Sequence, residues 1–170
     1  MAPLRALALT LTVTLAVVLQ VTLFGHLSFD GVVPNLALLV VVAAALVRGP
    51  EFAAVLGFAA GLAIDLAPPA DHVAGRWALA LVVVGYLAGR VRQDAGTSAV
   101  AAVVTVAASS FVGTSVFALS GLVLGDPSVP ATEALTVIPV AVLYDVLLTP
   151  FVLPVAMGLF RRFQPHQVAF

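Results

Sequence analysis

The stretch that decides the fold is SAVAAVVTVAASSFVGTSVFALSGLVL, which runs from Ser98 to Leu124 without a charged residue. A transmembrane helix needs about 20 mostly apolar residues to cross ~30 Å of hydrocarbon, and this segment is long enough. Five further apolar segments lie near Leu4–Phe24, Val33–Val47, Phe52–Ala67, Trp77–Val91 and Ala134–Phe160. The sequence therefore predicts an all-α integral membrane protein, a six-transmembrane-helix bundle that forms one polytopic domain over residues 1–170.

The composition supports this class and excludes others. Of the 170 residues, 62% are hydrophobic and 9% are charged, whereas a soluble domain is about one quarter charged. Disordered chains are poor in hydrophobic residues, so disorder is excluded as well. The absence of cysteine excludes disulfides and thiolate chemistry. A net charge of −1 offers no basic patch for nucleic acid.

The arginines orient the predicted bundle. Six of the seven fall on one side of an even-numbered topology: Arg5, Arg48, Arg90, Arg92, Arg161 and Arg162. The other side carries Arg76 together with Asp30, Asp71, Asp126 and Glu133. Arginine and lysine are enriched in cytoplasmic loops, so the N- and C-termini are predicted to be cytoplasmic.

Two acidic residues, Asp65 and Asp145, lie inside predicted spans. A charge at mid-membrane is costly, and such residues usually face the bundle interior or a cavity. Asp65 lies towards the outer end of the third segment, where a structural role is a cap or a hydrogen bond to a neighbouring helix. Asp145, with Tyr144 beside it, lies deeper, where a structural role is a clamp with hydroxyls of the fifth segment. The other interpretation makes both acids, with Tyr144, intramembrane polar or ligand-binding residues.

Small residues form a ridge that leads to Asp65. Ala53, Gly57, Gly61 and Asp65 recur at a spacing of four and therefore share one face of a helix. Gly85 and Gly89 repeat the same device in the fourth segment. Small residues at this spacing allow close helix approach, so the ridge is predicted to pack against another helix, either of this chain or of a partner.

The sixth segment contains Pro139, Pro150 and Pro154, which predict a kinked or broken helix. One interpretation is a discontinuous helix that lines a binding cavity near Tyr144 and Asp145, as in transporters. The other is a static bend. The first supports a second function hypothesis, a small-molecule-binding transporter subunit.

The sequence contains little that supports a catalytic site or a metal site. The three histidines are scattered, without the spacing of a metal site. Tyr144-Asp145 matches one motif of membrane aspartyl proteases, but Gly61-Leu62-Ala63-Ile64-Asp65 lacks the second glycine of the other motif, and the order is reversed. We therefore expect no enzymatic activity, no cofactor and no metal.

The residues from Pro34 to Leu66 resemble a known family. Pro34-Asn35-Leu36 opens the second segment, a Gly-Pro turn follows Arg48, and Gly57 to Leu66 then reads GFAAGLAIDL. This order is similar to the signature of the rod shape-determining MreD family, and the later Leu143-Tyr144-Asp145 with Arg161-Arg162 resembles the end of that family.

The resemblance implies a non-enzymatic component of the bacterial elongation and peptidoglycan-synthesis machinery in the inner membrane. It implies an S-component-like fold, similar to that of vitamin-transporter substrate-binding subunits. The implied partners are a bitopic MreC-like protein, an MreB-type cytoskeleton, a RodA-type glycosyltransferase and its transpeptidase, within membrane lipid. By the same resemblance Gly57, Gly61 and Asp65 match the family's most recognisable motif, and Asp145 matches its last-span acid.

Overall fold

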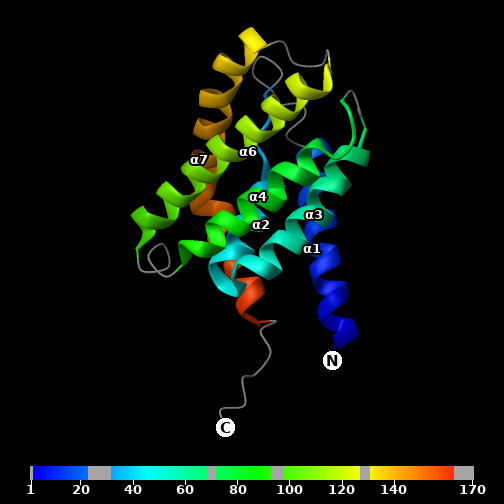
Figure 1. The fold of residues 1–170 in the computed structure, drawn as a ribbon. Helices are drawn as coiled ribbons and strands as arrows, with labels where there is room; N and C mark the ends of the chain where they lie inside the picture. Colours follow the sequence, from blue (N-terminus) through cyan, green and yellow to red (C-terminus); the bar gives the residue numbers. More distant parts are fainter. Residues whose placement is uncertain (1, 23–31, 69–71, 93–97, 127–130, 163–170) are drawn as a thin grey trace.

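A computed structural model describes residues 2–22, 32–68, 72–92, 98–126 and 131–162, with side chains from residue 11 onward and without those of 131–135. Within these ranges the chain forms six helices (Figure 1). They are α1 (Ala2–Thr22), α2 (Leu36–Arg48), α3 (Pro50–Leu66), α4 (Arg76–Arg90), α6 (Ala99–Leu124) and α7 (Ala131–Arg162). Each helix begins and ends within three residues of the corresponding apolar segment in the sequence.

Helix α2 forms the centre of the bundle. It contacts each of the other five helices, and every residue from Leu36 to Leu46 is buried. Its 13 residues span only about 20 Å, which is shorter than the ~30 Å hydrocarbon layer. A helix that is apolar on all sides is stable when neighbouring helices enclose it. Protein rather than lipid therefore surrounds α2, so its length does not have to match the thickness of the hydrocarbon layer.

One end of the bundle collects arginines, and we call it the arginine end. The Arg92 guanidinium lies against Gly49 in the turn between α2 and α3, and the rings of Phe52 and Phe160 lie 6.3 Å apart. These contacts bring together the ends of α2, α4 and α7, with Arg48, Arg90, Arg92, Arg161 and Arg162. Figure 1 shows the start of α1 and the last turn of α7 at the same, lower end. Cations at helix C-termini also interact favourably with the helix dipoles.

Helix α7 stays continuous through its three prolines, although Figure 1 shows that it changes direction along its length. Of the two interpretations of the prolines, a static bend agrees with this geometry and a discontinuous helix does not. All three prolines lie on the exposed side, where a missing N–H does not disturb the core. Buried residues occupy the opposite face: Asp145, Thr149, Leu153, Ala156 and Phe160.

Two of the described helices, Ala99–Leu124 and Thr136–Arg162, are long and apolar enough to cross a membrane by length and composition. Six membrane spans with cytoplasmic termini go further than this finding and stay a prediction.

Candidate functional site

Asp65, in the last turn of α3, caps a different helix. Its buried carboxylate accepts backbone hydrogen bonds from Gly75 at 2.8 Å and from Trp77 and Ala78 at 3.1 Å each. These donors belong to the N-terminus of α4, whose own N-cap residue is Gly75 and offers no side chain. An N-terminus attracts negative charge and needs acceptors for its first N–H groups. Asp65 therefore supplies from α3 the cap that α4 lacks.

Arg76, in the first turn of α4, forms a buried ion pair at the end of the bundle opposite the arginine end. Its Nη1 lies 2.7 Å from Oδ2 of Asp126, and its side chain is 1% exposed. Its Nε and Nη2 donate to the carbonyl oxygen of Phe117 at 3.3 and 2.8 Å, and the guanidinium lies 3.8 Å from the centroid of the Phe117 ring. Gly121 leaves room for this group, since a β-carbon there would overlap the guanidinium.

An aromatic and imidazole layer covers these two sites. His72 Nε2 lies 2.9 Å from Oδ1 of Asp65, and the His72 ring contacts Phe117 edge-on at 5.2 Å. Trp77 stacks on the same Phe117 ring at 4.5 Å. The Asp65 cap and the Arg76 ion pair therefore form one connected cluster that ties α3, α4 and α6 together.

Asp145, on α7, sits at the N-terminus of α2. Its carboxylate accepts from the backbone N–H of Asn35 at 2.8 Å and from the hydroxyl of Ser110 at 2.6 Å, and the residue is 1% exposed. Ser110 lies on α6, so the hydroxyl clamp considered from the sequence is present at that residue. Gln20, on α1, accepts from the Ala37 N–H at 3.2 Å. The N-terminus of α2 thus draws acceptors from α1 and α7.

Tyr144 is only half-buried and lies beside this cluster in sequence. In the part of the chain that the structure describes, the Asp145 carboxylate accepts from Asn35 and Ser110, and Tyr144 is not one of its partners. The structure therefore brings Asp145 into a helix cap and leaves Tyr144 outside it.

The small-residue ridge of α3 faces α4. A β-carbon at Gly57 would overlap the backbone of Leu81, and one at Gly61 would overlap the backbone of Ala78. The arrangement is reciprocal, because Gly85 lies on the backbone of Ala53 and Gly89 on that of Pro50. Of the two packing partners considered for the ridge, the structure places a helix of this same chain there, which leaves that face no room for another protein.

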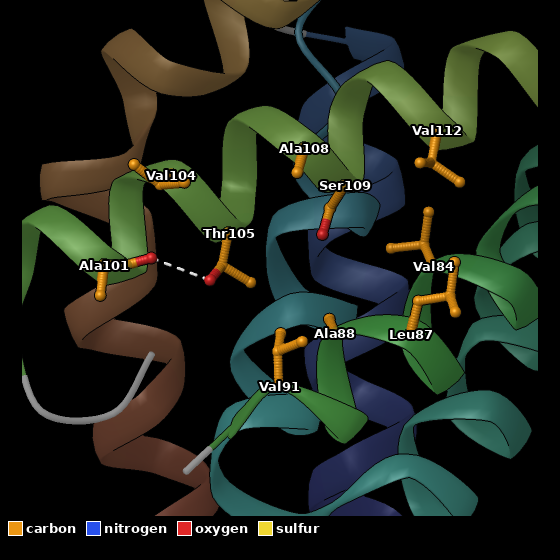
Figure 2. A pocket seen from close by; sticks show the side chains of 10 residues that line it. All are labelled: Val84, Leu87, Ala88, Val91, Ala101, Val104, Thr105, Ala108, Ser109 and Val112. Carbon is orange, nitrogen blue, oxygen red and sulfur yellow. Dashed lines mark hydrogen bonds between the residues drawn. The ribbon is translucent and has the colours of Figure 1, made fainter. Parts of the chain in front are cut away.

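A lateral cavity of about 460 Å³ lies between α4 and α6 (Figure 2). Its walls come from α4 and its C-cap residue, between Val84 and Val91, and from α6 between Ala101 and Val112. They are apolar except for two hydroxyls. That of Thr105 donates to the Ala101 carbonyl at 2.8 Å, and Figure 2 shows that of Ser109 pointing into the cavity. Neither Tyr144 nor Asp145 lines this cavity.

The two buried acids are engaged at separate places in the part of the chain that the structure describes. It contains no group of three or more histidines and acids placed to hold a metal ion. Asp65 and Asp145 bind the N-termini of two different helices. Asp30, Asp71 and Asp94 lie outside the described residues, as does the side chain of Glu133.

The sequence singles out the two acids but not the backbone N–H groups that they bind. Asn35 stands directly before the apolar run of α2, a recognisable N-cap position, and its Oδ1 accepts from the Leu38 N–H at 2.9 Å. Arg76 was visible as the exception to the arginine bias, and Asp126 lies on the same predicted side. For Asp145 the sequence predicts a hydroxyl of the fifth segment but does not specify that it is Ser110.

These features define a helical membrane protein whose buried carboxylates serve its own helix termini. The model of the rod shape-determining protein MreD family matches residues 2–162, so the chain belongs to that family and has a role in rod shape determination. Comparisons with curated proteins and with solved structures found no match. The family belongs to the cell-shape machinery with MreC and MreB, and it is not known for enzymatic activity.

Proposed function

We propose that this chain is a non-enzymatic, multi-pass component of the bacterial inner membrane that docks a bitopic MreC-like partner. Its six helices cross the bilayer with both termini cytoplasmic. Through that partner it holds a RodA-type glycosyltransferase and its transpeptidase near an MreB-type cytoskeleton. Family membership over residues 2–162 carries the proposal, and the grouping of arginines at one end supports the orientation.

The outer face of α7 is the docking face in this proposal. Exposed apolar residues recur along it at a spacing of four: Leu143, Leu147, Phe151 and Val155. Pro150 and Pro154 lie on the same exposed side, and neither has an N–H to donate to the carbonyl four residues earlier. Freed carbonyls in hydrocarbon are stabilised by polar groups of a neighbouring helix. A transmembrane helix of the partner supplies such groups together with an apolar surface.

The test is co-purification of the MreC-like protein from native membranes. We expect Leu147→Ala with Phe151→Ala to lower its recovery several-fold while the chain itself is recovered normally. The matched control is Val55→Ala with Phe58→Ala, an equally exposed pair on α3. Equal recovery with both pairs would place the partner on another face. Absence of the partner from the wild-type preparation would contradict the proposed function itself.

The alternative, an S-component-like subunit that binds a small molecule, has less support. Its motive in the sequence is the proline-containing sixth segment with Tyr144 and Asp145, and a polar cavity around these two residues would favour it. Asp145 is instead enclosed by Asn35 and Ser110, and the cavity between α4 and α6 has almost entirely apolar walls.

A further inference from the structure

The lateral cavity between α4 and α6 has the length of one membrane leaflet. At ~1.5 Å per residue, the wall from Ala101 to Val112 is about 16 Å long, roughly half of the ~30 Å hydrocarbon layer. The cavity stops at Val112 because the next residue, Gly113, is packed against Leu38 and Val84, each 3.1 Å from the position of a β-carbon there. A transmembrane helix of a partner would need a groove about twice as long, whereas one lipid acyl chain fits this length.

One end of the cavity, at Val91, lies at the arginine end of the bundle. Val91 lines the cavity where α4 ends, and exposed Arg90 and Arg92 flank it in sequence. Arg48 adds a third guanidinium at the same arginine end, 4.2 Å from the ring centroid of Phe52. Basic side chains beside a membrane surface attract anionic lipid headgroups.

The cavity walls suit an acyl chain as well. Apart from Thr105 and Ser109, they consist of Val, Leu and Ala side chains. The volume of about 460 Å³ falls within the range of small-ligand sites, about 300–1,000 Å³. Exposed Leu87 and Val104 stand on opposite walls. The Ser109 hydroxyl is the polar group that Figure 2 shows inside.

We propose that this cavity binds one anionic phospholipid from the leaflet at the arginine end. One acyl chain lies between α4 and α6, and the headgroup phosphate lies at Arg90 and Arg92. This site is separate from the α7 face that we assign to the partner, so it does not depend on the proposed function. The arginines that flank Val91 and the apolar walls of one-leaflet length are the observations that carry it.

The experiment is native mass spectrometry of the full chain released from detergent micelles after addition of phosphatidylglycerol and phosphatidylcholine in equal amounts. We expect one phosphatidylglycerol to be retained in preference to phosphatidylcholine. Arg90→Gln and Arg92→Gln should each lower that retention about fivefold, the change expected for one basic residue facing an anionic lipid. Arg161→Gln, at the same end but on α7, is the matched control and should leave it unchanged.

The cavity itself is tested by filling it. Ala108→Phe, at an exposed position of the wall, should remove retention of both lipids, while Ala59→Phe on the exposed side of α3 should not. Val104→Phe serves as a second filling variant if Ala108→Phe does not fold. Equal retention of the two lipids by the wild type, or undiminished phosphatidylglycerol in a folded filling variant, would overturn the proposal. A folded filling variant that loses the bitopic partner but retains phosphatidylglycerol as the wild type does would overturn the lipid proposal in favour of a protein occupant.

Discussion

The backbone N–H of Ala78 donates to the carboxylate of Asp65 at 3.1 Å, and the same stretch of α4 backbone lies against Gly61, one turn before Asp65. The ridge and the acid at its end are thus two parts of one contact. Gly61 allows α4 to come close, and Asp65 then reaches its first N–H groups. The contact explains why a buried charge is tolerated at this position, since four polar groups surround it.

Replacement of Asp65 should therefore destabilise the fold. We expect Asp65→Ala to lower the free energy of unfolding by about 1–3 kcal/mol, because several N–H groups lose their acceptor in a buried place. Thermal unfolding in detergent micelles measures the effect. Glu51→Gln, which alters an exposed acid at the start of α3, is the control and should change the melting temperature little. Equal melting temperatures for the two variants would contradict the cap.

A single methyl group tests the packing of the ridge. Gly61→Ala should cost about 1–3 kcal/mol, the usual range for overpacking, because its β-carbon meets the backbone of Ala78 and not a flexible side chain. Gly158→Ala on α7 has open space around its new β-carbon and should be neutral or stabilising. The comparison of the two melting temperatures is decisive, since both changes add the same atom to a helix.

The ion pair between Arg76 and Asp126 can be measured by a double-mutant cycle. Arg76→Met alone should cost about 3–5 kcal/mol, because it leaves the Asp126 carboxylate buried without its cation. The double variant Arg76→Met with Asp126→Leu should cost less than the sum of the two single changes. Additive single and double effects on unfolding would show that the two residues do not interact.

Asp145 is expected to act through its hydrogen bonds. Asp145→Leu leaves the Asn35 N–H and the Ser110 hydroxyl without an acceptor and should cost about 1–3 kcal/mol. Asp145→Asn keeps an acceptor oxygen and should retain more stability and full cell-shape complementation. If Asp145→Asn folds normally but fails to restore rod shape, the carboxylate has a role beyond the cap.

Orientation is open to a direct chemical test because the chain has no cysteine. Ser98→Cys, at the exposed start of α6, and Val73→Cys, at the exposed entry to α4, place single thiols at opposite ends of the bundle. In intact cells a membrane-impermeant maleimide should label the second and spare the first. The reverse pattern would invert the proposed topology.

The sequence predicts the helices closely but not which of them is central. Hydropathy locates all six apolar segments, since each is a run of apolar residues between polar turns. It does not distinguish α2, because a helix that is apolar on all sides looks the same whether lipid or protein surrounds it. The enclosure of Leu36 to Leu46 depends on the other five helices, and that is a property of the assembled bundle.

In the candidate sites too, the sequence predicts the local features but not the contacts between distant segments. A regular spacing of four reveals the ridge from Ala53 to Asp65, because helix geometry is local. The partner of Asp145 is not local, since Asn35 lies 110 residues away along the chain. The cavity between α4 and α6 is defined by the gap between two surfaces, and ordinary Val, Leu and Ala residues carry no signal of it.

The two caps also differ in when the growing chain can form them. Asp65 precedes Ala78 by 13 residues, so α3 and α4 can settle as a hairpin as soon as both have left the ribosome. The Asn35 N–H can bind Asp145 only after α3, α4 and α6 have been synthesised. The cap at the N-terminus of the central helix is therefore completed only when α7 has been added. A nascent chain that stops short of α7 leaves the Asn35 N–H at the N-terminus of α2 without the Asp145 acceptor. Membrane quality control could recognise this exposed helix terminus.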